Sequence, residues 1–145
     1  KEKLQAASRN QAQITTCSHL LVFCTDTNLE ERVNEVARAM EKAGVAQRAV
    51  KTFAERIGGG FIKRMDEEGR RRWAERQTFL AFENALLGAK ALGLDSCPME
   101  GFDKEEYNRL LQLPAHLKVL AVCPVGYAAD APPVKVRLPK EQVFF

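Results

Sequence analysis

WAERQTFLAFENALLGAKALGLDSCPMEGFD, residues 73–103, is the stretch that decides the fold of this 145-residue chain. Its first part predicts one long helix, since only three polar residues interrupt the apolar run from 79 to 92. Gly93 supplies the stop. The chain then runs extended into a turn at Pro98–Gly101, where proline fixes its own φ and glycine permits close approach of another group.

A helix that is apolar nearly all round must be covered on most of its sides. Small residues on adjoining turns would let another backbone come close to it; these are Ala81, Ala85, Gly88 and Ala89. The pattern fits the central helix of a fold or a dimer interface. An ordinary core helix with no role in a dimer fits the periodicity equally well.

Composition places the chain among globular proteins of about one domain, which we expect to span residues 1–145. Hydrophobic residues make up 46% and charged residues 28%, and the net charge of +3 comes from scattered cations without interleaved aromatics. This balance gives no support for a nucleic-acid partner. No apolar run reaches the roughly 18 residues of a membrane span. The four cysteines lack metal-site spacing, which favours reduced thiols in a cytoplasmic protein.

Before the long helix, apolar periodicity and turn residues predict three helices and one strand. In chain order these are a polar helix over 1–16, a strand over 18–25 buried on both faces, a helix from 29 that ends at Gly44, and a helix over 46–57 that ends at a flexible joint, Gly58–Gly60. The pairs Thr27/Glu30 and Asn28/Glu31 each fit a capping box at the start of the third element.

After the turn, Asp103 and Glu106 fit a capping box for a helix that ends near 111, and residues 117–124 read as a second buried strand. Residues 134–139 alternate, which predicts an extended strand with Lys135 and Arg137 on one side, about 7 Å apart. Such a pair suits an anion such as a phosphate monoester. A charged edge strand that resists aggregation explains it as well. Composition and spacing alone thus indicate an α/β or α+β domain.

Three segments in this order resemble the FMN-dependent nitroreductase family, closest to its oxygen-insensitive NAD(P)H nitroreductase and dihydropteridine reductase branch. They are ERQTFLAFENALLGAKALGLDSCPMEGFD (75–103), VLAVCPVGYAAD (119–130) and KVRLP (135–139), and NQAQITTCSHLLVFC (10–24) also fits. The resemblance implies an α+β fold with a central mixed, mainly antiparallel sheet surrounded by helices. It also implies a homodimer with the long helix at the interface and flavin sites built from two subunits.

The resemblance carries specific residues onto the cofactor FMN. The turn Pro98, Met99, Glu100, Gly101 corresponds to the family's Pro-x-Glu-Gly turn, whose main-chain N–H groups meet the flavin N5. Asn10 matches the asparagine at the pyrimidine edge of the ring, and Gln13 stands where several members have a lysine. Lys135 and Arg137 match the pair that binds the FMN phosphate, which favours the anion-binding interpretation of that pair.

The implied function is an oxidoreductase in which NAD(P)H passes hydride to flavin N5 and a nitroaromatic or quinone then accepts the electrons by ping-pong kinetics. The flavin carries the chemistry, so we expect no catalytic protein nucleophile and no metal. His19 has no acidic or nucleophilic neighbour at a recognisable spacing, and we expect it to be structural.

Two departures from the family pattern open an alternative. The chain begins after the point where members carry a phosphate motif, a helix pair and the first strand, so we expect the C-terminal two-thirds of a nitroreductase. Such a chain could instead be a non-catalytic remnant that oligomerises and binds FMN weakly or not at all. The second departure is Glu83, where relatives usually have glycine before Asn84; a glutamate there must find a partner or face water.

Overall fold

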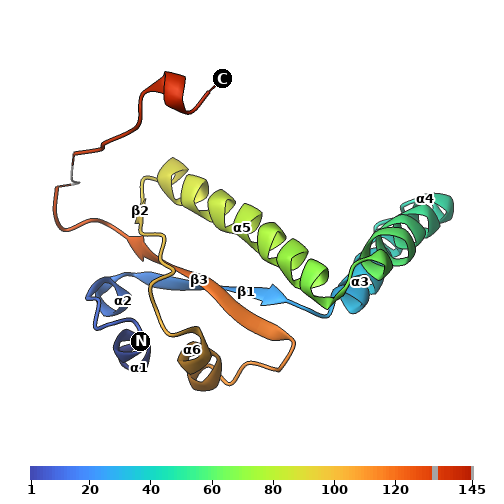
Figure 1. The fold of residues 1–145 in the computed structure, drawn as a ribbon, viewed down its shortest axis with the longest axis horizontal. Helices are drawn as coiled ribbons and strands as arrows, with labels where there is room; N and C mark the ends of the chain where they lie inside the picture. Colours follow the sequence, from blue (N-terminus) through green and yellow to red (C-terminus); the bar gives the residue numbers. More distant parts are fainter. Residues whose placement is uncertain (132–133, 145) are drawn as a thin grey trace.

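The fold is a small antiparallel sheet with helices on both faces and a separate group of helices at one end (Figure 1). A computed structural model describes residues 1–131 and 134–144. Its elements are, in order, α1 (Glu2–Ala6), α2 (Gln13–Thr16), β1 (His19–Asp26), α3 (Leu29–Lys42), α4 (Gln47–Phe53), η1 (Ala54–Phe61), η2 (Ile62–Arg64), α5 (Glu67–Ala91), β2 (Asp95–Ser96), α6 (Lys104–Leu110), β3 (Leu117–Gly126) and η3 (Lys140–Gln142). The predicted α+β class is confirmed.

β3 is the central strand of the sheet, and its neighbours β1 and β2 both run antiparallel to it. Residues 119–125 are all buried, which explains why this strand is an unbroken apolar run. The prediction that residues 18–25 are buried on both faces is wrong. β1 is an edge strand of the sheet in the described chain, and within it Thr25 alone is fully buried.

The long helix α5 lies across one face of the sheet (Figure 1). Its N-cap is Asp66, whose carboxylate accepts a 2.7 Å hydrogen bond from Gly69 N, and the left-handed Gly93 (φ 75°) follows its end. Phe82 and Ala89 pack with β3 in one buried cluster. The predicted long helix is therefore confirmed, with its inner face on the sheet.

The outer face of α5 exposes two large apolar side chains among polar and charged ones, and no other described segment covers them. Leu80 is 62% exposed and Leu87 is 61% exposed. The expectation that the helix is covered on most sides is therefore not met by the described residues alone. Glu83 is also exposed, so this carboxylate faces water rather than a buried partner.

The opposite face of the sheet is covered by the N-terminal helices and α6 (Figure 1). Residues 1–16 form two short helices rather than the single helix predicted. The break falls at Arg9 and Asn10, whose φ angles of 55° and 56° are left-handed and cannot continue a right-handed helix. This break places both residues in a tight turn between α1 and α2.

The helices at the far end of the sheet differ from prediction in two places. Asn28 is the N-cap of α3 but makes no side-chain cap bond; instead the Asp26 carboxylate accepts a 2.8 Å hydrogen bond from Asn28 N. The glycines of Gly58–Gly60 are not a flexible joint, because α4 continues as a π-helix through Phe61. Gly44 does end the preceding helix segment in a left-handed conformation, as predicted (φ 79°).

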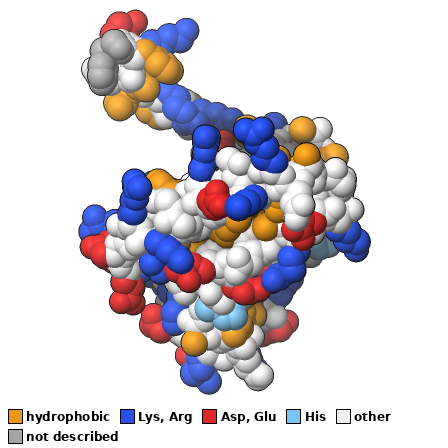
Figure 2. All heavy atoms as spheres, turned by 90° about the vertical axis from the view of Figure 1, so that its right-hand side faces the viewer, with side chains coloured by type: hydrophobic (Ala, Val, Ile, Leu, Met, Phe, Trp, Pro, Cys, Tyr) orange, Lys and Arg blue, Asp and Glu red, His pale blue; other side chains and the backbone are white. Residues whose placement is uncertain are grey.

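The last described segment is an arm that extends away from the body (Figure 1). Residues 134–139 form no strand pairing with the rest of the described chain, so the predicted strand is corrected to an extended segment. Val134 is 91% exposed and Val136 is 83% exposed. Figure 2 shows Lys and Arg side chains along this arm and hydrophobic ones towards its end. Pro132 and Pro133 lie outside the described residues.

Two further properties of the described ranges bear on function. None of their helices combines the length and the apolar character needed to cross a bilayer. In residues 1–131 and 134–144, no three His, Cys, Asp or Glu side chains gather in a way that could hold a metal ion.

Candidate functional site

The predicted turn at residues 98–101 is fixed to the edge of the central strand. Met99 N donates to Val122 O at 2.9 Å, and Val122 N donates back to Met99 O at 3.0 Å. The Met99 side chain is buried in the core cluster under α6. One end of the turn is thus held by the sheet and by apolar packing, while Glu100 and Gly101 remain exposed.

Glu100 and Gly101 present two consecutive main-chain N–H groups without an acceptor in the described chain. The neighbouring donors are all used: Met99 N bonds to Val122 O, Phe102 N to Glu100 O at 3.0 Å, and Asp103 N to Ala7 O at 2.8 Å. Backbone donors rarely stay unpaired unless water or a ligand accepts from them. The turn therefore offers a pair of exposed donors between N–H groups that are already bonded.

The structure brings the predicted residue Gln13 to the turn, and Asn10 lies three residues earlier on the same segment. Gln13 Nε2 lies 3.7 Å from Met99 Sδ, across 86 residues of sequence. Asn10 is exposed in the left-handed turn before α2, and its N–H is held by Gln5 O at 3.0 Å. The side-chain amides of Asn10 and Gln13 therefore belong to the segment that lies next to the two free N–H donors.

A buried hydrogen-bond chain fixes the N-terminal segment to α6. Ser8 and Tyr107 are both fully buried, and their hydroxyl oxygens are 2.7 Å apart. Ser8 Oγ also lies 2.8 Å from Leu4 O, which can only accept, so the serine donates there and Tyr107 donates to the serine. Burial raises the pKa of Tyr107, so the phenol keeps its proton. Sequence reasoning missed this pair, because only tertiary structure shows that they meet.

The predicted anion-binding pair does not join these residues within one chain. Lys135 and Arg137 are exposed on the arm, and the guanidinium of Arg137 donates to the neighbouring Val136 O at 2.9 Å. The structure thus brings together five of the eight predicted residues, Gln13 and Pro98–Gly101, with Asn10 on the same segment as Gln13, and leaves the two cations on the arm.

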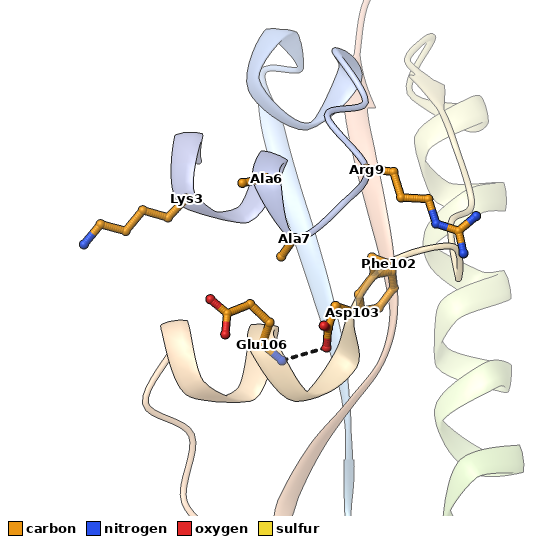
Figure 3. Close-up of a pocket in the computed structure, with 7 residues that line it drawn as sticks. All are labelled: Lys3, Ala6, Ala7, Arg9, Phe102, Asp103 and Glu106. Carbon is orange, nitrogen blue, oxygen red and sulfur yellow. Dashed lines mark hydrogen bonds between the residues drawn. The ribbon is translucent and has the colours of Figure 1, made fainter.

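An open hollow of about 570 Å³ lies between α1 and α6, next to the turn (Figure 3). Its charged groups are Lys3, Arg9, Asp103 and Glu106. Both carboxylates are already engaged: Asp103 caps α6 through Glu106 N at 2.9 Å, and the Glu106 carboxylate pairs with Arg109. Only half of the predicted capping box forms, since Asp103 N donates to Ala7 O and not to the Glu106 carboxylate. The charged residues that line the hollow are of both signs, so the hollow would not select an anion or a cation.

Two of the four thiols, those of Cys24 and Cys123, are made less reactive by burial. All four are free in the described chain, and burial raises the pKa values of Cys24 and Cys123. A raised pKa keeps a thiol protonated and therefore a poor nucleophile.

The chain belongs to the nitroreductase family: the model of that family matches residues 2–127. It is 35% identical to the protein DrgA of Synechocystis over 88% of this chain and 58% of DrgA. It is 30% identical to an oxygen-insensitive NAD(P)H nitroreductase of Enterobacter cloacae over 81% of this chain and 57% of that protein. The chain thus spans somewhat more than half the length of these two relatives.

A solved structure supports the same fold. The chain superposes with a TM-score of 0.87 on a protein from Exiguobacterium sibiricum that is described as a nitroreductase in complex with FMN. The two are 19% identical, and the match covers 98% of this chain and 69% of the other. At that identity the superposition supports the fold alone, and it confirms the family fold expected from the sequence.

Proposed function

We propose that this protein is an FMN-dependent oxidoreductase that uses NAD(P)H to reduce nitroaromatics, quinones or similar acceptors. The observation that carries the proposal is the pair of free N–H groups at Glu100 and Gly101, set beside Asn10 and Gln13. Family membership and the names of the relatives, which include NAD(P)H nitroreductases, agree with it. The FMN complex of the similar fold supports the choice of cofactor.

The residues of the turn suit a flavin ring. A Cβ added at Gly101 would meet no atom within 4 Å, so the space above this residue is open to a ligand. Bound FMN would supply the hydride-accepting and hydride-donating chemistry, with NAD(P)H as the reductant. The two free N–H groups would donate to the ring edge that becomes electron-rich, which is a preorganised electrostatic role.

The remaining residues have binding roles in this proposal. Asn10 and Gln13 would hydrogen-bond the pyrimidine edge of the ring, and the neutral Gln13 would give less charge stabilisation than a lysine. Lys135 and Arg137 would bind the phosphate. We assign no protein nucleophile, because the bound flavin would carry the chemistry.

We also infer that the protein works as a homodimer. Leu80 and Leu87 leave an apolar stripe on the outer face of α5, and large exposed apolar surfaces usually mark an interface. The arm carries further exposed apolar residues, among them Val134 and Val136, whose burial against another surface would be favourable. A second copy on α5 would cover the stripe. The same association would give the arm a surface to bind.

A cytoplasmic location completes the proposal. Four free cysteines in the described chain agree with a reducing compartment, where thiols persist.

One observation favours the alternative of a non-catalytic member that oligomerises but binds FMN weakly. Lys135 and Arg137 do not reach the turn residues in the single chain, so the phosphate end of the site is not assembled there. The exposed face of α5 would drive association in either case.

Colour separates the two functions. The oxidoreductase should take up added FMN, show a flavin absorption band and bleach when NADH or NADPH is added. A dimeric protein that stays colourless after incubation with FMN and removal of the excess would contradict the oxidoreductase and favour the alternative.

A further inference from the structure

We propose that Gln11 is a positioning residue that holds the turn at 98–101 in the conformation that presents its free N–H groups. This inference rests on the proposed function, since it explains how the flavin-facing turn is kept in place. Gln11 is not among the residues singled out from the sequence.

The side-chain amide of Gln11 joins two segments that are 90 residues apart. Its Nε2 donates to Ser8 O at 3.1 Å and to Gly101 O at 3.4 Å, and its Oε1 accepts from Gln13 Nε2 at 3.1 Å. These contacts use both N–H groups and the carbonyl of the amide. They also fix its orientation, because the reversed amide would set an oxygen against two carbonyl oxygens.

The bond to Gly101 acts on the peptide next to the free donors. Gly101 O belongs to the same residue as one of the two unpaired N–H groups, so its position limits how that residue can rotate. The 3.4 Å separation is long for a hydrogen bond, so the two 3.1 Å contacts orient the amide and the contact with Gly101 O restrains the turn more loosely. Gln11 is therefore placed to restrain the turn without being buried in the core.

A second set of contacts makes the two segments rigid independently of Gln11. Asp103 N bonds to Ala7 O, and the buried hydroxyls of Ser8 and Tyr107 join α1 to α6. Loss of the Gln11 amide would leave these contacts intact. The folded state and the position of the turn can therefore be tested separately.

The test is the Gln11→Met variant, which keeps the length of the side chain and removes both donors. Gln47→Met, at an exposed residue of α4, is the matched control. Dissociation constants for FMN should be measured by titration, and amide exchange of the FMN-free protein by NMR. Loss of preorganising hydrogen bonds should weaken FMN binding by about fivefold, and Gln47→Met should leave it unchanged.

Amide exchange distinguishes positioning from general destabilisation. In Gln11→Met the amide of Phe102, which bonds within the turn, should exchange about fivefold faster, while that of Asp103, held by Ala7 O, should keep its rate. Equal acceleration at both amides would mean a structural role and would overturn the inference. Unchanged FMN affinity would overturn it as well. If the wild-type protein binds no FMN, the proposed function fails, and an unchanged Phe102 amide would then show that Gln11 does not hold the turn either.

Discussion

The two halves of the proposed FMN site are held in different ways. The turn half, Asn10, Gln13 and Pro98–Gly101, is assembled inside one chain by the sheet, by buried packing and by hydrogen bonds between distant segments. The arm half, Lys135 and Arg137, stands on an exposed arm with no contact to the turn half in the described chain. The first half is preorganised, whereas the second depends on whatever orders the arm.

This difference assigns separate energetic roles to the two halves. A preorganised turn loses little conformational entropy when a ligand binds, so its donors can contribute nearly their full interaction. An exposed arm must be ordered first, and in the proposed homodimer the second copy would order it. Substitutions in the turn half should therefore change FMN affinity directly. Substitutions in the proposed dimer interface on α5 should change FMN affinity indirectly, through the order of the arm.

The largest effect should come from Leu87→Glu on the outer face of α5. Burying a leucine contributes about 1.5–3 kcal/mol, and a two-fold interface counts the loss twice, so the dimer dissociation constant should rise by at least about a hundredfold. Sedimentation equilibrium measures the change, with Val36→Glu on exposed α3 as the control. A Leu87→Glu protein that dimerises as tightly as wild type would show that this face of α5 is not the dimer interface.

Replacing Lys135 and Arg137 together with alanine should weaken FMN binding next most strongly. A hydrogen bond to a charged group is worth about 1.5–3 kcal/mol, so the dissociation constant should rise by about tenfold or more. The melting temperature without FMN should not change, because both side chains are exposed. Lys140→Ala, a cation further along the arm, is the control. Unchanged FMN retention in the double variant would remove the phosphate role.

Removing the Ser8 hydroxyl should lower the unfolding free energy more than removing the Tyr107 hydroxyl. Ser8→Ala leaves the buried Tyr107 hydroxyl without its partner and should cost about 2 kcal/mol of unfolding free energy. Tyr107→Phe should cost about 1 kcal/mol, since Ser8 still donates to Leu4 O. Urea denaturation measures both. The reverse order would mean that Tyr107 does not donate to Ser8.

Gly101→Ala should separate binding from stability at the turn itself. The new methyl group meets nothing in the chain and the residue is not left-handed, so the unfolding free energy should stay the same or rise by about 0.4–1 kcal/mol. FMN affinity should fall by about fivefold, because the methyl group occupies the space that a close flavin needs. Equal FMN affinity for the two proteins would mean that the flavin does not approach this residue.

The smallest effect should come from Glu68→Gln, which touches neither half. Hydrogen bonds from Arg71, and then from Arg72, lower the pKa of Glu68 to about 2. A depressed pKa contributes stability above the unfolded value of 4.5 that is lost as pH falls towards about 2. The variant should therefore melt slightly lower than wild type near neutral pH, and the difference should vanish near pH 2. A difference that persists there would contradict the ion pairing; FMN affinity should be unaffected.

Local pattern was enough to predict the elements on which the turn half stands. The buried strand β3 and the stop at Gly93 both follow from residue types at short spacing. Resemblance to a family, rather than pattern, was needed to connect Asn10 and Gln13 with the turn. The contact between Gln13 and Met99 joins residues that are 86 positions apart, and no periodicity in the sequence predicts it.

The departures from prediction occur where tertiary contacts override local preference. Arg9 and Asn10 adopt left-handed angles in succession, which is uncommon for residues other than glycine, and contacts from α6 hold the segment around them. The alternating residues of the arm suggested a strand, but a strand needs a neighbour to pair with, and the described chain offers none. The sequence pattern shows which side chains of the arm alternate, but it does not show which surface the arm would pack against.

The most direct test is the affinity for FMN, measured as the protein is diluted through its dimer dissociation constant. If the turn half is complete in one chain and the arm half needs a second copy, affinity should fall on dilution. It should level off near the value of the Lys135/Arg137 double alanine variant. Monomers that bind FMN as tightly as dimers would contradict the division of the site into a preorganised half and a half that needs a partner.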